Sequence, residues 1–197
     1  MIRRLAVALL LFSLVPPSTA EADWLISPFL GISFAGDTTF LVLEEGAGRA
    51  VTIGGSLMLL GNSFLGVEAE VAHSPRFFEG DDPRGLVLNS RVTTLSGNLV
   101  IAAPLSLTRE SLRPYAAGGL GLMQARSKNA GGLFPIAQDL LGFNVGGGAL
   151  GLLTPRTGVR FDLRHFKAIT GADGALARPG ISRLSFWRAT VGAVFSY

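Results

Sequence analysis

The chain has 197 residues, of which 48% are hydrophobic and 16% charged, with a formal net charge of +3 and no cysteine. Without cysteine there is no disulfide framework and no lipid-attachment site, which excludes a disulfide-stapled secreted domain and a lipoprotein. The 17 basic residues are dispersed, without a basic stripe or interleaved stacking aromatics. This pattern argues against nucleic-acid binding.

The N-terminus predicts a secretory signal peptide. Arg3 and Arg4 precede an apolar run over residues 5–15, and small residues follow up to Ala22. This order of a basic, an apolar and a small-residue region is the signal-peptide pattern, and the apolar run is too short to span a bilayer. We expect a signal peptide over residues 1–22, cleaved after Ala22 or, as the alternative, after Ala20, followed by one domain over residues 23–197.

The hydrophobicity of the remaining chain is spread out. The mean hydropathy is +0.44, yet no stretch of eighteen consecutive apolar residues follows the signal segment. A membrane helix needs such a stretch, whereas a transmembrane barrel covers its lipid face with strands of about 9 to 11 alternating residues. The 26 glycines, scattered through the apparent strands, fit the close packing inside a narrow barrel.

Period-two alternation predicts eight strands separated by turn-forming segments. The expected strands cover residues 24–35, 50–60, 64–73, 90–103, 113–125, 140–153, 158–169 and 184–197. Four long segments, 36–49, 74–89, 126–139 and 170–183, alternate with three shorter connections. Long loops outside and short turns in the periplasm are the outer-membrane pattern. We therefore predict an all-β, eight-stranded antiparallel up-and-down transmembrane β-barrel.

Four segments together resemble a known family: RPYAAGG at 113–119, LGFNVGGG at 141–148, VRFDLRHF at 159–166 and the C-terminal strand. They are similar to the small eight-stranded outer-membrane barrels typified by the membrane domain of OmpA and by OmpX-like and opacity-type proteins. The resemblance implies the outer membrane of a Gram-negative bacterium, contact with outer-membrane lipid and lipopolysaccharide, and assembly by periplasmic chaperones and the barrel-assembly machinery. It also implies that Phe195 and Tyr197 form a C-terminal assembly signal.

Side-chain parity predicts a charge network inside the barrel. Glu68 and Glu70 share one face of their strand, while Arg160, Asp162 and Arg164 share one face of theirs. Arg188 has the same inward parity in the last strand. Since unpaired charges are costly in a confined interior, we expect the two glutamates to face these arginines, with Asp162 joining the network. A charged plug is favoured over a gate or small pore, because eight strands leave room for little more than side chains.

Aromatic residues near strand ends predict interfacial girdles. The candidates are Trp24, Phe34, Tyr115, Trp187 and Tyr197. An amphipathic ring is favoured at headgroup level. Trp187 and Tyr197 have lipid-facing parity, and with Trp24 they are the strongest candidates.

The sequence favours neither catalysis nor a metal site. His73 and Ser74 are neighbours on a strand and must point to opposite faces, so they cannot form a dyad. His165 is followed two residues later by Lys167, which departs from the histidine–serine spacing of barrel deacylases. The acidic segment 79–82 lacks an ordered ligand loop for calcium. We expect no enzyme activity, no cofactor and no metal.

Three functions stay open. The first is a structural or surface-exposed interaction role without chemistry. The second is a narrow channel for small solutes, and the third is an adhesin that binds an unknown surface ligand through its long loops. The apolar pieces 40–43 and 77–78 of these loops are either contact sites or strand extensions.

Overall fold

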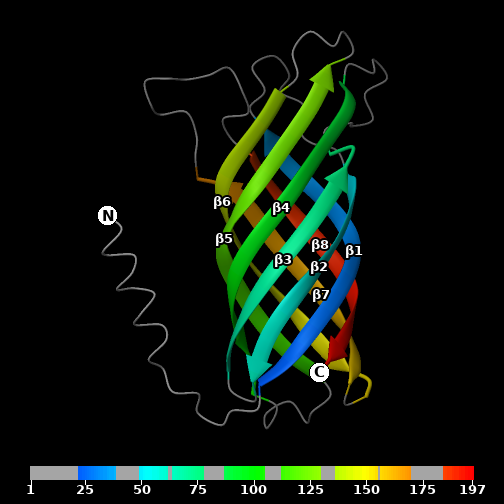
Figure 1. Ribbon diagram of the computed structural model, residues 1–197, viewed down its shortest axis with the longest axis vertical. Coiled ribbons are helices and arrows are strands. Elements are labelled where there is room, and N and C mark those ends of the chain that lie inside the picture. The colour runs from blue at the N-terminus through cyan, green and yellow to red at the C-terminus, as the bar shows by residue number, and fades with distance from the viewer. Residues whose placement is uncertain are drawn as a thin grey trace, which may run out of the picture.

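The computed structural model is a closed barrel of eight antiparallel strands, so the predicted fold is confirmed (Figure 1). It describes residues 22–38, 49–61, 64–77, 87–104, 112–129, 136–154, 156–169 and 184–197. The strands are β1 (Ala22–Thr38), β2 (Ala50–Gly61), β3 (Leu65–Pro75), β4 (Val87–Ala102), β5 (Leu112–Asn129), β6 (Ile136–Leu152), β7 (Thr157–Ala168) and β8 (Leu184–Ser196). Within these residues, the structure contains no helix that is long and apolar enough to cross a bilayer.

The register of the strand pairs fixes the shape of the barrel. Following pairing partners from Trp24 through the eight strands leads to Trp187 of β8 and back to β1 at Phe34. The path returns 34 − 24 = 10 residues further along β1, which is the shear of the barrel. Eight strands with this stagger tilt strongly against the barrel axis, as Figure 1 shows, and enclose a lumen narrow enough for side chains to fill.

The connections differ in one respect from the expected alternation. β5 and β6 continue beyond their predicted ends, to Asn129 and from Ile136, so the connection between them covers only residues 130–135. The connection between β4 and β5, at the opposite end, covers residues 103–111 and is longer. The prediction of four long segments was therefore wrong for the third one, because its alternating residues extend the β5–β6 hairpin.

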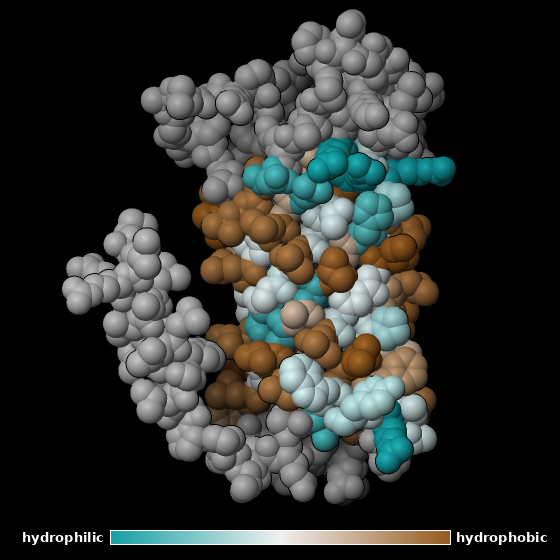
Figure 2. All heavy atoms as spheres, viewed as in Figure 1, coloured by the Kyte–Doolittle hydropathy of each residue, from teal (hydrophilic) through white to brown (hydrophobic). Residues whose placement is uncertain are grey.

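The outer surface is an apolar belt. Side chains with outward parity are exposed and mostly large and hydrophobic, among them Leu30, Leu99, Leu120 and Phe161. Along β1 this belt runs from Trp24 to Phe34, and ten residues at a rise of about 3.3 Å and a tilt of about 40° give a height of about 25 Å. That height matches the lipid-facing band of outer-membrane barrels. On the visible face hydrophobic patches alternate with residues of intermediate hydropathy over the height of the barrel, and hydrophilic residues gather along its upper rim (Figure 2).

Two residues with positive φ shape the upper end of the barrel, where β1, β3, β5 and β7 end. Ala35 has a φ of 50° and lies at a shift in register between β1 and β8, which is a β-bulge. Arg76 has a φ of 54° and follows β3. This left-handed residue turns the chain inward, so that Phe77 is buried inside the barrel with only 2% of its surface exposed. Phe77 is therefore neither a strand extension nor an exposed contact site, and residue 78 lies outside the described residues.

The lumen is filled in three layers. A lower apolar layer consists of Leu25, Met58, Leu60, Val100, Ala102, Tyr115, Ala117, Leu150 and Val194. An upper apolar layer consists of Ala50, Phe77, Val92, Met123, Ala125, Leu140, Phe166, Leu184 and Phe186. Polar and charged side chains lie between the two layers. The upper layer includes a cluster of phenylalanines, in which Phe166 stacks on Phe186 at 5.1 Å and Phe77 meets Phe186 edge-on at 5.0 Å.

Candidate functional site: the charged lumen

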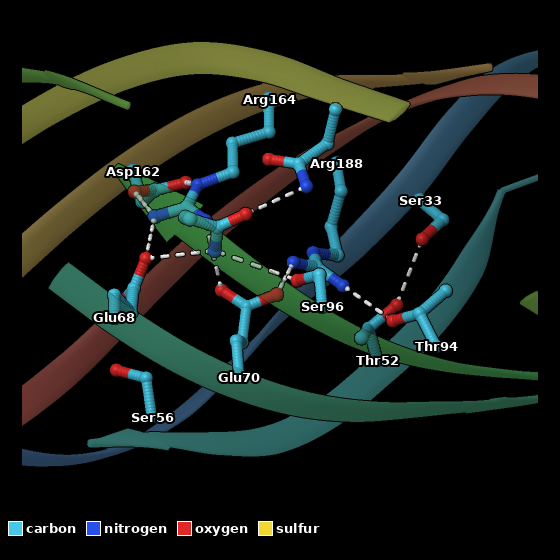
Figure 3. Close-up of polar contacts among 12 residues, drawn as sticks. Ser33, Thr52, Ser56, Glu68, Glu70, Thr94, Ser96, Asp162, Arg164 and Arg188 are labelled. Atoms are coloured by element: carbon cyan, nitrogen blue, oxygen red, sulfur yellow. Dashed lines mark hydrogen bonds and ion pairs between the residues drawn. The ribbon is translucent and has the colours of Figure 1, made fainter. Parts of the chain in front are cut away.

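Three strands supply the ion-paired charges of the lumen, whereas the buried Arg113 of β5 donates to the backbone carbonyls of Ala103 and Gly61 instead. β3 contributes Glu68 and Glu70, β7 contributes Arg160, Asp162 and Arg164, and β8 contributes Arg188. Alternate residues of a strand share a face, so each run places its charges inside and its apolar residues outside. All six side chains are buried. The structure thus brings the six sequence-predicted charged residues together between the two apolar layers. Figure 3 shows how Glu68, Glu70, Asp162, Arg164 and Arg188 converge.

Glu68 is held by two arginines from the opposite wall. Its Oε1 atom lies 2.5 Å from Arg160 Nη1, and its Oε2 atom lies 2.7 Å from Arg164 Nη2. Asn98 Nδ2 of β4 donates a third hydrogen bond to Oε2 at 3.1 Å. Each carboxylate oxygen therefore has a cationic partner, which is the condition for keeping a buried charge.

Asp162 is the second acceptor of the same two arginines. Arg164 Nε donates to Oδ1 at 2.8 Å, and Arg160 Nη2 donates to Oδ2 at 3.0 Å. The Tyr115 hydroxyl also donates to Oδ2 and accepts a hydrogen bond from Arg160 Nε at 2.6 Å. The expectation that Tyr115 lies in an interfacial girdle was wrong. Its parity on β5 points inward, and its ring lies in the lower apolar layer with the hydroxyl directed at the network.

Glu70 joins the network to β8. Arg188 Nη2 donates to Glu70 Oε1, while Arg164 Nη1 lies 3.5 Å from Oε2. The Arg188 guanidinium also stands over the Phe166 ring at 4.3 Å, a cation–π contact. Arg188 therefore connects the ion pairs to the upper apolar layer.

Neutral polar residues extend the site, and these were missed from the sequence. Thr52 Oγ1 is hydrogen bonded to Ser33 Oγ at 2.9 Å and to Ser74 Oγ at 2.6 Å. Asn144 Nδ2 of β6 donates to Asn98 Oδ1 at 2.8 Å. The signal that could have found them is the same parity rule, because Thr94, Ser96 and Asn98 alternate with Thr93, Leu95, Gly97 and Leu99 along β4.

Glycines on β6 make space for the large side chains of β5 and β7. A Cβ atom at Gly148 would lie 2.7 Å from the Tyr115 hydroxyl, and one at Gly146 would lie 2.9 Å from Arg164 Cγ. Real Cβ atoms do not approach this closely. The glycine run at 146–148, noted in the sequence for its resemblance to the family, thus leaves room for the network on its inward positions.

The chemistry of the site is that of a neutral plug. Three guanidinium groups, of Arg160, Arg164 and Arg188, balance three carboxylates. Within the described part of the chain no group of three His, Asp or Glu side chains could hold a metal ion. A cavity of about 10 Å³ beside Asn144, whose Oδ1 atom has no hydrogen-bond donor, has room for about one water molecule.

The other sequence-predicted residues lie away from the lumen. His73 faces outward and is hydrogen bonded to Thr93 Oγ1 at 2.9 Å, whereas Ser74 is buried inside. His165 packs against the outward-facing Trp187, with ring centroids 5.0 Å apart. Trp24, Trp187, Phe195 and Tyr197 are all exposed on the outer surface. The acidic segment 79–82 and the apolar segment 40–43 lie outside the described residues.

Comparison with known proteins agrees with this architecture. The model of the outer membrane protein beta-barrel domain family matches residues 5–195. Neisserial surface protein A is similar in structure, with a TM-score of 0.65 at 11% identity over 89% of this chain and 97% of that one. The N-terminal barrel of Pseudomonas aeruginosa OprF has a TM-score of 0.56 at 16% identity over 91% and 100%. Ail of Yersinia pestis has a TM-score of 0.52 at 14% identity over 90% and 99%. No curated protein sequence matches the chain.

Proposed function

Because the chain belongs to the outer membrane protein β-barrel domain family and is an outer-membrane barrel, we propose that it is a non-conducting scaffold without catalysis. In this proposal the barrel holds the connections of its upper end, at residues 39–49, 76–86, 130–135 and 169–183, at the cell surface. The observation that carries the proposal is the filled lumen. A balanced network of ion pairs lies between two apolar layers, and together they occupy the space that a conduit would need.

Several contacts support a lumen that stays closed. Ions would have to displace Phe77 and Phe186 in the upper layer and then separate Glu68 and Glu70 from their arginines. Removing one partner of a buried pair costs about 3–5 kcal/mol. A narrow solute channel is therefore the weaker candidate.

Planar-bilayer recording tests the proposal. The purified barrel in 1 M KCl is expected to give no discrete conductance steps. The double variant Glu68→Ala with Arg164→Ala removes two long side chains from the lumen, and it is recorded beside the unaltered protein as the form in which conductance is easier to detect. The single variant Arg156→Ala, in the exposed turn between β6 and β7, is the matched surface control. Reproducible steps from the unaltered protein would contradict the scaffold proposal and favour the channel.

A second candidate function is binding of a surface ligand through the upper connections. Two observations favour it. The β5–β6 hairpin continues to Asn129 and Ile136, beyond the last outward-facing leucines of the belt, Leu122 and Leu141. One of the similar structures, Ail, was solved with the heparin analogue sucrose octasulfate. Replacing residues 39–48, 78–86, 130–135 and 171–183 together by short glycine–serine linkers should abolish such binding and leave the heat-modifiable mobility of the barrel unchanged.

Biogenesis is part of the proposal as well. We propose that residues 1–22 are a signal peptide and that Phe195 and Tyr197 are read by the barrel-assembly machinery. Both aromatic side chains lie on the outer surface next to the β1–β8 seam, where they are accessible before the barrel closes. Trp24 and Trp187, near opposite ends of the outer belt, would anchor the barrel in the two headgroup regions.

A further inference from the structure

Two arginines stand directly opposite each other on the outer surface. Arg91 of β4 and Arg126 of β5 are partners in the antiparallel register, and both side chains are exposed. Directly opposed residues have Cβ atoms about 5 Å apart, and like charges in this arrangement are destabilising. In the lumen of the same barrel every arginine of the network has a carboxylate partner. The outer pair, by contrast, makes no ion pair with any carboxylate of the described residues.

The position of the pair relative to the belt is specific. The last large apolar side chains of the belt are Leu95 on β4 and Leu122 on β5. Thr93 and Gln124, themselves register partners, form the next outward-facing pair, and Arg91 with Arg126 follows. Two residues of a tilted strand rise about 5 Å. The guanidinium groups therefore lie just above the hydrocarbon, at the depth of lipid headgroups, on the end of the barrel that carries the longest connections.

The neighbouring carboxylate does not neutralise the pair. Asp139 of β6 is exposed near Arg126, but it accepts a hydrogen bond from Gln124 Nε2 at 2.9 Å. It forms no ion pair with Arg126, although its charge reduces the local positive potential. Two guanidinium groups and one engaged carboxylate leave a net positive rim on β4 and β5, in agreement with the hydrophilic upper edge of this face in Figure 2.

The rim is different on the opposite side. At the upper end of the β1–β8 seam the outward-facing residues are Phe34 and Trp187, which are register partners. They suit packing against acyl chains and glycerol or sugar groups, not against an anion. The pair on β4 and β5 is thus the place where two outward-facing arginines oppose each other in the register, while single exposed cations, Arg49, Arg76 and Lys167, lie near the upper ends of β2, β3 and β7.

We propose that Arg91 and Arg126 form a binding site for a phosphomonoester on the headgroup of an outer-leaflet glycolipid. A phosphomonoester carries about −1.5 to −2 charges at neutral pH, which matches two guanidinium groups, whereas a phosphodiester carries one. Each guanidinium can present two N–H donors to phosphate oxygens. Apolar contact for the acyl chains is supplied directly below by Leu95 and Leu122.

Native mass spectrometry of the detergent-solubilised full-length barrel tests the site. The protein is incubated separately with bisphosphorylated lipid A, with its fully dephosphorylated form and with phosphatidylglycerol, a phosphodiester. We expect selective retention of the bisphosphorylated lipid. Retention should fall about tenfold in Arg91→Gln and in Arg126→Gln, because each loses a charge-assisted contact, and further in the double variant.

Arg156→Gln is the matched control, since it removes one exposed arginine from the lower rim and should retain lipid as the unaltered protein does. The heat-modifiable gel mobility of each variant verifies that its barrel is folded. Equal retention of dephosphorylated lipid A or of phosphatidylglycerol would overturn the proposed phosphomonoester site. Undiminished retention in the folded single and double variants would overturn it as well. None of these outcomes bears on conductance, so the scaffold proposal is tested separately.

Discussion

Arg164 of β7 and Glu68 of β3 meet across the lumen, with Nη2 and Oε2 2.7 Å apart, although 96 residues separate them in the chain. In a closed barrel of eight strands, β3 and β7 are four strands apart in either direction and so form opposite walls. Backbone pairing joins each of these strands only to its two neighbours. The ion pair therefore ties together walls that the hydrogen-bonded sheet connects only through three intervening strands.

Neutralising Glu68 should destabilise the barrel. Glu68→Gln keeps the side-chain shape but leaves Arg160 and Arg164 with less negative charge in a buried site. We expect the free energy of unfolding to fall by about 3 kcal/mol, measured by urea titration of vesicle-refolded protein with tryptophan fluorescence. The exposed carboxylate of Asp139 provides the control, because Asp139→Asn should change the free energy by no more than about 0.5 kcal/mol. Similar losses in both variants would show that the lumenal network is not what stabilises the fold.

The inward position of Gly148 should not tolerate even a methyl group. A Cβ atom there would meet the Tyr115 hydroxyl at 2.7 Å and also the backbone oxygen of Phe161. Gly148→Ala is expected to lower the free energy of unfolding by about 1–3 kcal/mol through overpacking. At Gly97, on the outer face of β4, a Cβ atom would meet nothing within 4 Å. Gly97→Ala should therefore be neutral or stabilising by about 0.5 kcal/mol. The same urea titration compares the change in the free energy of unfolding caused by the two substitutions.

The fold and the charges of the lumen were accessible to sequence reasoning because both depend on a period of two. Alternation along β3 and β7 separates Glu68 and Arg164 from their apolar neighbours without knowledge of which strands face each other. The sign of the charges then narrowed the choice of ion-pair partners, since the carboxylate of Glu70 needs a cation and Arg188 has inward parity. The alternation of charged and apolar residues is especially clear in a membrane barrel, because few charged residues are tolerated on its lipid-facing side.

Other features were not accessible because they break that period. The left-handed backbone of Arg76 directs Phe77 into the lumen, and no side-chain alternation encodes this turn. Tyr115 was assigned to the interface by residue type, although its parity with Arg113 and Ala117 already placed it inside. The hairpin of β5 and β6 was predicted too short because polar residues such as Arg126 resemble a loop in sequence, whereas above the membrane they continue a strand.

The terminal tyrosine contributes to the β1–β8 seam through its backbone, and this contribution can be measured separately from that of its side chain. Tyr197 N donates to Trp24 O at 3.0 Å, and Trp24 N donates to Tyr197 O at 3.2 Å. Tyr197→Ala keeps both backbone bonds and removes a side chain that is 80% exposed, so the refolded variant should lose no more than about 0.5 kcal/mol. Deleting residue 197 removes both bonds and should cost about 1–2 kcal/mol, as measured by urea titration.

In cells the two Tyr197 variants should behave alike if the terminal aromatic is an assembly signal. Both would then reduce the amount of heat-modifiable protein in the outer-membrane fraction, although only the deletion weakens the seam. Ser196→Ala, which keeps the terminal ring and the backbone, is the control and should assemble normally. Normal assembly of Tyr197→Ala would contradict the signal role and leave Tyr197 with a purely structural contribution.

The bulge in β1 predicts a stabilising substitution. Ala35 has a φ of 50°, and a residue with a Cβ atom pays about 1 kcal/mol for this left-handed conformation, which glycine adopts freely. Ala35→Gly should therefore raise the free energy of unfolding by up to about 1 kcal/mol, despite the larger entropy of glycine in the unfolded chain. Ala69, an exposed residue of β3 in regular register, is the control: Ala69→Gly should lower it by about 0.5–1 kcal/mol. Parallel urea titrations decide the matter, because equal destabilisation by both glycines would mean that Ala35 carries no strain.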